Sequence, residues 1–223
     1  TRDKGLVMTI TDDDFTVHVD VDFAGNWKRD EAADDPDTAR SRHGYINSWS
    51  GCPLIWVSWL QSEIALSSTE SEFIGLSMAL RETIPLMELL KDLKQQGVPV
   101  GSTKPKVFCR VFEDNSGALE IATVPKMRPR TKTINIKYHH FPQYVDRGEI
   151  EVKAIDSEDN PADMMTKPVT LGILQRHRET ILGWAAQLNQ VVRGSVKNSN
   201  PDGIGNPSKA GEHQPGQAPE PKI

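Results

Sequence analysis

Residues 17–22 read Val-His-Val-Asp-Val-Asp, so apolar and polar side chains alternate along this stretch. An alternation with a period of two predicts a β-strand, because successive side chains of a strand point to opposite faces. Asp20 lies between strongly apolar positions, in what we expect to be a central strand of a sheet. We therefore predict that this strand organises the fold and carries a functional acidic residue.

The segments that follow predict further strands and helices. A hairpin is expected around Gly51, a long helix from Ser67-Ser68-Thr69 to about residue 96, and an acidic loop over 26–42. The predicted strands of the hairpin are 44–49 and 53–60, and two later strands are predicted at 106–113 and 149–155. Later helices are predicted at 118–122 and 133–146. A last short helix is expected to begin at Asn160-Pro161, with Asn160 as its cap. This order predicts an α/β fold with a mixed five-stranded sheet and helices on its faces.

Apolar residues of the long helix and the hairpin indicate the core. The apolar stripe of the helix recurs at helical spacing and consists of Phe73, Leu76, Leu80, Ile84 and Met87. Pro85 lies in the same helix and is expected to kink it, because an interior proline removes a backbone hydrogen bond. Trp49, Trp56 and Trp59 are expected to pack in the core of the hairpin.

Charge, hydropathy and cysteine content limit the class of protein. The chain has 223 residues and a formal net charge of −5, the wrong sign for a protein that coats nucleic acid nonspecifically. No apolar run approaches the roughly 20 residues that a transmembrane helix needs. Cys52 and Cys109 are too few for a disulfide framework, so we interpret both as small buried hydrophobic residues in a reducing compartment.

Four acidic residues lie at the edges of predicted elements rather than on solvated faces. They are Asp20 in the first strand, Glu72 near the start of the long helix, Asp114 at the end of a strand and Asp163 near the start of a late helix. Carboxylates that converge without a cation repel one another and raise one another's pKa values. A converging set therefore indicates a site for a hard cation such as Mg²⁺, which takes oxygen ligands.

Each acid alone also has an ordinary structural interpretation. Glu72 completes a capping box with Thr69, and Asp163 would favour the dipole of its helix from the first turn. Asp114 would suit an Asx-turn, and Asp20 would suit an edge strand, as a charge that discourages aggregation. Only the four together, in this order and context, indicate a metal site.

Several segments carry a more specific pattern. They read VDVDFAG at 19–25, ALSSTESEFIGL at 65–76, EDNSGA at 113–118, RTKTINIKYH at 130–139 and NPADMMTK at 160–167. These segments, together with a loop at 41–45, resemble the conserved blocks of copia-type (LTR) retrotransposon ribonuclease H, a domain of the Pol polyprotein. The resemblance covers roughly residues 15 to 170.

The resemblance implies a ribonuclease H-like fold and a metal-dependent endoribonuclease that hydrolyses the RNA strand of RNA–DNA hybrids during reverse transcription. It implies Asp20, Glu72, Asp114 and Asp163 as the catalytic, metal-binding acids. Two Mg²⁺ ions are expected, with Mn²⁺ as a substitute: Asp20 would bridge both, Asp163 would complete the site that activates water, and Glu72 and Asp114 would hold the ion at the leaving oxygen. Asp22 and Glu70 are neighbours in the same blocks and not ligands.

The resemblance also implies partners and a location. The expected partners are the RNA–DNA hybrid and the reverse transcriptase domain of the same polyprotein, in the cytoplasm and within virus-like particles. Two alternatives share the fold: a catalytically inactive connecting or nucleic-acid-positioning module, and another nuclease such as an integrase or junction resolvase. A positioning module needs no set of four carboxylates, and the sequence blocks of the other nucleases differ, so the ribonuclease is favoured.

Positive charge gathers in one stretch of the chain. No acidic residue lies between Ile121 and Val145, and the basic residues there are Lys126, Arg128, Arg130, Lys132 and Lys137. We predict that they bind the nucleic-acid backbone; the alternative is a solvated basic face without a partner. His139 and His140 would point about 100° apart on a helix, so we expect a structural role for His139 rather than a zinc site.

The sequence predicts four parts of the chain. We expect a leader over 1–14, a ribonuclease H-like domain over 15–170, a C-terminal amphipathic helix over 171–194 and a disordered tail rich in proline and glycine over 195–223. The amphipathic helix would be either a contact with another part of a polyprotein or the last packed helix of the domain.

Overall fold

Five strands form one mixed sheet with β1 at its centre. The computed structural model describes residues 5–8, 14–31, 34–100, 107–124 and 138–184. The strands are β1 (Phe15–Asp22), β2 (Arg42–Trp49), β3 (Cys52–Leu60), β4 (Cys109–Glu113) and β5 (Ile150–Ala154), in the order β3-β2-β1-β4-β5. The pairs β1–β2 and β2–β3 are antiparallel, and β1–β4 and β4–β5 are parallel. The prediction of an α/β fold with a mixed five-stranded sheet is confirmed.

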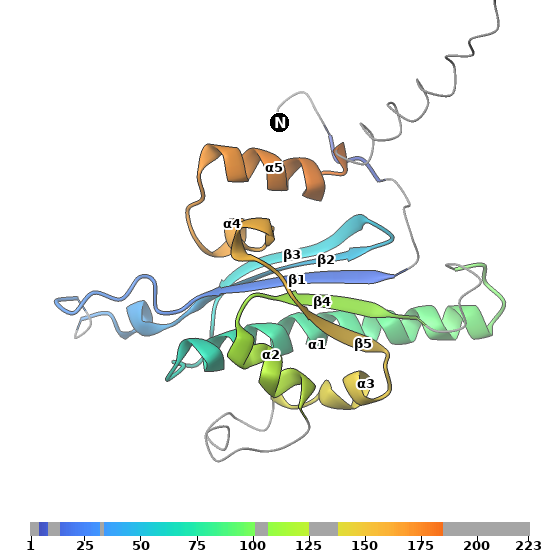
Figure 1. Cartoon of the computed structure of the whole chain (residues 1–223), viewed down its shortest axis with the longest axis horizontal. Helices are drawn as coiled ribbons and strands as arrows, with labels where there is room; N and C mark the ends of the chain where they lie inside the picture. The colour runs from blue at the N-terminus through green and yellow to red at the C-terminus, as the bar shows by residue number, and fades with distance from the viewer. Residues whose placement is uncertain (1–4, 9–13, 32–33, 101–106, 125–137, 185–223) are drawn as a thin grey trace, which may run out of the picture.

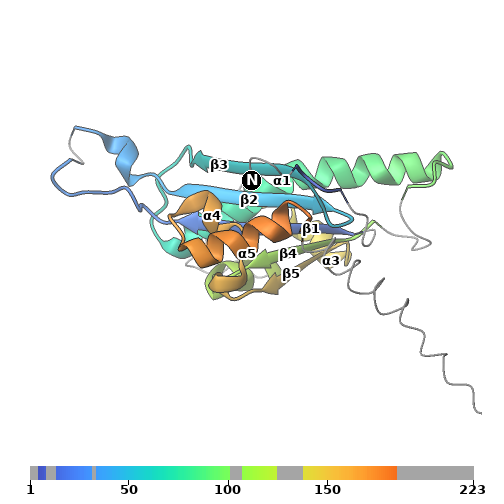
Figure 2. The same cartoon turned by 90° about the horizontal axis from the view of Figure 1, so that it is seen from above.

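Helices cover both faces of this sheet (Figures 1 and 2). On one face lie α1 (Ser68–Gln95), α2 (Ser116–Thr123) and α3 (Pro142–Asp146), and on the other lie α4 (Asp163–Thr166) and α5 (Leu171–Ile181). Two 3-10 helices that were not predicted, η1 (Pro36–Ala39) and η4 (Ser157–Asp159), interrupt the connecting loops. Among the described helices, none combines the length and the apolar character that crossing a membrane requires.

The core lies between α1 and the sheet. The predicted stripe of α1 is buried in full: Phe73, Leu76, Leu80, Ile84 and Met87. It packs against Val17 and Val19, two of the inward-facing valines of β1. Helix α1 continues through Pro85, which lies on its exposed side. Cys52 and Cys109 are free and buried, as expected.

Two hairpin tryptophans lie outside the core, so that prediction is wrong for them. Trp56 and Trp59 are 58% and 62% exposed, whereas Trp49 is partly buried and packs against the core. The reason is that β3 is an edge strand. Trp56 instead lines an apolar cavity together with Met165 of α4 and Leu174 of α5.

Two late helices begin further along the chain than predicted. Residues 133–137 lie outside the described residues, residues 138–141 are not α-helical, and α3 starts at Pro142. Proline suits a first helical turn, where its missing N–H has no partner in any case. Likewise α4 starts at Asp163, and Asn160 does not cap it. The Asn160 amide donates a 2.7 Å hydrogen bond to the Val19 carbonyl instead, which ties this loop to β1.

Strand β2 carries no side chain where α4 crosses it. Gly44 is the register partner of Asp20 on the neighbouring strand. A Cβ at Gly44 would lie 2.5 Å from the Cβ of Met165 and 2.9 Å from Cγ2 of Thr166. Glycine therefore permits the close approach of α4 to the sheet beside Asp20.

The two ends of the described chain meet at α5. The Val7 N–H donates a 2.9 Å hydrogen bond to the Leu182 carbonyl, and the Trp184 indole donates one of 2.8 Å to the Gly5 carbonyl. Part of the predicted leader thus contacts the residues just after α5, which ends at Ile181 and not at residue 194 as predicted for the amphipathic helix. The predicted tail over 195–223 lies outside the described residues.

Candidate metal centre

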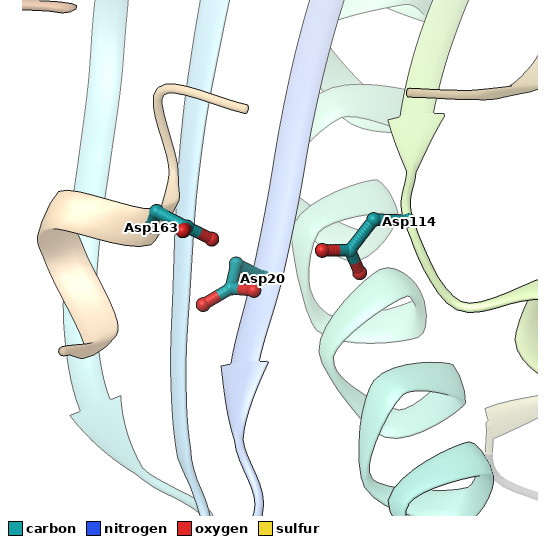
Figure 3. A group of neighbouring side chains, drawn as sticks. All are labelled: Asp20, Asp114 and Asp163. Atoms are coloured by element: carbon teal, nitrogen blue, oxygen red, sulfur yellow. The ribbon is translucent and has the colours of Figure 1, made fainter. Parts of the chain in front are cut away.

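Carboxylates from separate segments of the chain converge near the carboxyl ends of β1 and β4. Oxygens of Asp20, Asp114 and Asp163 lie within 4.8 Å of one another, and so do oxygens of Glu72, Glu113 and Asp114. Figure 3 shows Asp20 between Asp163 and Asp114. Asp114 belongs to both groups, so they form one cluster. The structure brings together the four predicted acids and adds Glu113, which was not predicted.

Asp20 occupies the centre of the sheet and not an edge, so its interpretation as an edge-strand charge is wrong. Its side chain is buried. The Thr166 hydroxyl donates a hydrogen bond to Oδ2 of Asp20, and Nζ of Lys167 lies 3.5 Å from Oδ1. Burial raises the pKa of the Asp20 carboxyl, against the hydrogen bond from Thr166.

The first turn of α1 leaves Glu72 free for the cluster. Ser67 is the N-cap, and its hydroxyl accepts a 3.1 Å hydrogen bond from the Glu70 N–H. Glu70 in turn accepts a 2.8 Å hydrogen bond from the Leu66 N–H. The capping interpretation of Glu72 is therefore wrong, because Glu70 has the capping role. Burial, followed by the charges of Glu113, Asp20 and Asp114, raises the pKa of Glu72 to about 10.

A neighbouring asparagine performs the turn role considered for Asp114. Oδ1 of Asn115 accepts hydrogen bonds of 3.0 Å from the N–H groups of Gly117 and Ala118 and caps α2. The half-buried Asp114 is held differently, by a 2.5 Å hydrogen bond from the Ser157 hydroxyl to its Oδ2. Its carboxylate therefore lies at the cluster rather than in an Asx-turn.

Asp163 begins α4, so its charge also lies where it favours the helix dipole. Nζ of Lys167 lies 3.0 Å from Oδ1 of Asp163, in addition to its contact with Asp20. Burial lowers the pKa of Lys167, but the hydrogen bond to Asp163 and the nearby carboxylates outweigh it and raise the pKa. Lys167 thus neutralises part of the charge on the Asp20–Asp163 side of the cluster.

Glu113 is the acid that sequence reasoning missed. It is the last residue of β4, and the alternation of that strand places it on the inward face with Cys109 and Val111. It is 1% exposed, and the Asn115 N–H donates a 3.0 Å hydrogen bond to its Oε1. Burial, with the charges of Asp114 and Asp20, raises the pKa of Glu113 to about 8, against the hydrogen bond from Asn115. The strand alternation was the available signal.

Comparison with known proteins identifies the family. No family model matches the sequence. Three curated relatives are retrovirus-related Pol polyproteins: those of transposon TNT 1-94 from Nicotiana tabacum, at 32% identity over 152 residues, and of transposons RE2 and RE1 from Arabidopsis thaliana, each at 30% identity, over 151 and 162 residues. The chain belongs to the retrovirus-related Pol polyproteins of transposons. The matches cover 68–73% of the chain but only 9–10% of the relatives, so this Pol segment spans about a tenth of their length.

Two solved structures are similar in fold to this Pol segment. LC11-RNase H1, isolated from compost, has a TM-score of 0.48 and 15% identity, and the match covers 69% of this chain and 93% of that chain. The N-terminal RNase H domain of Rv2228c from Mycobacterium tuberculosis, in fusion with maltose-binding protein, has a TM-score of 0.41 and 14% identity, with 79% and 98% covered. The strand order and the helices on both faces are those of the ribonuclease H-like fold, which confirms the predicted fold class.

The donor set of the Pol segment fits a divalent cation. All candidate ligands are carboxylate oxygens, which hard cations prefer. Within the described part of the chain, Oε2 of Glu72 and Oε2 of Glu113 are buried without a hydrogen-bond partner. Buried ionised carboxylates without a partner are costly, and a cation would compensate both.

Other predicted site residues lie apart from the cluster or are not described. The five basic residues Lys126, Arg128, Arg130, Lys132 and Lys137 lie outside the described residues, so their role stays a prediction. His139 packs on the ring of Phe73 at 5.0 Å between centroids, and Nδ1 of His140 lies 3.3 Å from the Ser77 hydroxyl. Both contacts suit structural roles.

Proposed function

We propose that this Pol segment is a metal-dependent endoribonuclease that hydrolyses the RNA strand of RNA–DNA hybrids during reverse transcription of a retrotransposon. The observation that supports this most is the convergence of Asp20, Glu72, Asp114 and Asp163 in one largely buried cluster. A connecting module would gain nothing from such a cluster, because buried like charges destabilise a fold.

The carboxylates would share two Mg²⁺ or Mn²⁺ ions. In this proposal Asp20 and Asp163 would hold the first ion, and Asp20, Glu72 and Asp114 would hold the second. The bound ions would activate the attacking water and stabilise the leaving 3′ oxygen, which gives a 5′ phosphate and a 3′ hydroxyl. Selection of the RNA strand would depend on contacts to 2′-hydroxyls and on hybrid shape.

Neighbouring side chains would hold these ligands in position. The hydroxyl of Thr166 restricts the carboxylate of Asp20, and the hydroxyl of Ser157 restricts that of Asp114. Lys167 links Asp163 to Asp20 across the gap between α4 and β1. Such supporting hydrogen bonds keep ligands oriented before the ion and the substrate arrive.

Cleavage of a labelled RNA–DNA hybrid by the full chain tests the proposal. We expect the RNA strand to be cut in Mg²⁺ or Mn²⁺, the DNA strand to stay intact, and the activity to disappear in EDTA. Double-stranded DNA and double-stranded RNA serve as substrate controls. Binding of hybrid without any cutting would instead favour a positioning module, or dependence on the reverse transcriptase domain, which we propose as the partner within the polyprotein.

The basic residues provide a separate prediction about substrate affinity. Neutralising Arg128, Arg130 and Lys132 together is expected to weaken hybrid binding and to flatten its salt dependence. Each lost phosphate contact removes about 0.9 from the slope of log K against log salt, so the triple variant should lose about 2 to 3. The measurement is fluorescence anisotropy at several salt concentrations in Ca²⁺, and an unchanged slope would show that this stretch does not bind the backbone.

A further inference from the structure

Glu113 occupies a position where a strand normally carries an apolar residue. The alternation of β4 is buried, half-buried, buried, half-buried, buried, and Glu113 takes the last buried place. Cys109 and Val111, on the same face, belong to the hydrophobic core. A carboxylate on this face is costly unless something compensates its charge, so its presence calls for a partner.

Within the described part of the chain, only one of the two oxygens of the Glu113 carboxylate has a hydrogen-bond partner. Oε1 of Glu113 accepts the 3.0 Å hydrogen bond from the Asn115 N–H, whereas Oε2 has no partner among the described residues although the side chain is only 1% exposed. Oε2 of Glu72 is also buried and without a partner in the described part of the chain. The two glutamates and Asp114 have oxygens within 4.8 Å of one another.

The fold holds these groups together, and within the described part of the chain no Lys or Arg side chain forms an ion pair with any of the three. The Thr69 hydroxyl, in the first turn of α1, donates a 3.4 Å hydrogen bond to Asn115 and so links the helix of Glu72 to the strand end of Glu113. Lys167 is ion-paired on the other side of the cluster, with Asp20 and Asp163. The side formed by Glu72, Glu113 and Asp114 therefore has the oxygen donors that a divalent cation requires, and Oε2 of each glutamate has no other partner among the described residues.

We propose that Glu113 is a fifth carboxylate of the metal centre and binds, with Glu72 and Asp114, the cation on the α1 side of the cluster. This inference rests on the proposed function, since it concerns the same centre, but it adds a ligand beyond the four acids that the family resemblance implies. Because a further charged ligand strengthens cation binding, this side should bind Mg²⁺ or Mn²⁺ without help from substrate phosphates.

Calorimetric titration of the metal-free full chain with Mn²⁺, without nucleic acid, tests this role. We expect Glu113→Gln, which keeps shape and removes charge, to weaken one Mn²⁺ binding event by about tenfold or more. Glu113→Asp, which keeps the charge on a shorter side chain, should weaken it as well. The matched control is Glu151→Gln, because Glu151 is an exposed residue of β5 paired with Lys153 at 3.2 Å, and this variant should bind Mn²⁺ like the wild type.

The melting temperature is a second measurement, which shows whether Glu113 is a metal ligand or a purely structural residue. In EDTA, Glu113→Gln should melt at a higher temperature than the wild type, and its gain in melting temperature on adding Mn²⁺ should be smaller. Wild-type Mn²⁺ affinity in both Glu113 variants would overturn the inference, even if the hybrid is cut. Conversely, Mn²⁺ binding that depends on Glu113 in a protein that cuts no hybrid would uphold the inference and count against the proposed function.

Discussion

The Asp114→Asn variant is expected to cleave the RNA strand about a thousandfold more slowly than the wild type, equal to about 4 kcal/mol of transition-state stabilisation. Asp114 belongs to both groups of the cluster and would hold the second ion, so its loss removes a ligand from the centre of the site. Asparagine keeps an oxygen that can accept the hydrogen bond from Ser157. The variant should therefore fold normally. The measurement is single-turnover cleavage of a labelled hybrid at saturating protein.

Asp22→Asn is the matched control for this variant. It makes the same chemical change at the end of β1, two residues beyond Asp20 and at a residue not expected to be a ligand. Its cleavage rate should stay within about threefold of the wild type, since Asp22 belongs to neither group of the cluster and substitutions away from a site usually have small effects. Wild-type cleavage by Asp114→Asn would remove this residue from the proposed metal centre.

The stability of the metal-free protein is expected to fall as the pH rises above about 5. The pKa of Glu72 is raised to about 10 and that of Glu113 to about 8, so both carboxyls keep their protons in the fold at a pH where the unfolded chain has lost them. Stability falls with pH wherever the folded state binds more protons. Each such group contributes at most about 1.4 kcal/mol per pH unit, so we expect the two together to lose at most about 5 kcal/mol between pH 6 and pH 8.

Urea denaturation in EDTA at several pH values measures this effect. Glu72→Gln cannot titrate at that position, so its unfolding free energy should depend on pH about half as strongly. Saturating Mg²⁺ should oppose the loss, because a cation binds the ionised carboxylates and its stabilisation grows with pH. A free energy that is constant between pH 6 and pH 8 in EDTA would show that the cluster does not hold its protons.

The sheet and the main helix were predictable because their signals are local. The alternation around Val19 and the helical spacing from Phe73 to Met87 depend only on how side chains project from a strand or a helix. The exposure of Trp56 and Trp59 was not predictable in the same way. It depends on β3 being an edge strand, which is a property of the assembled sheet.

The candidate site was predictable only in part. Taken singly, Glu72 and Asp114 fitted a capping box and an Asx-turn, and only the family resemblance selected them as ligands. The structure argues against the capping and turn roles, because Glu70 and Asn115 already make those hydrogen bonds. Glu113 has no counterpart among the four acids of the resemblance, so its inward position in β4 is its only signal in the sequence.

The hydrogen bond from Thr166 to Asp20 joins residues 146 positions apart in the chain. Contacts of such long sequence separation tend to form late in folding, because closing the intervening loop is costly in entropy. The acidic centre is therefore complete only after β1, β4 and α4 have assembled. A partly folded chain would have the acids but not their arrangement, so the proposed cation binding would mark the completed fold, and an emerging polyprotein would gain this centre only after α4 has been synthesised.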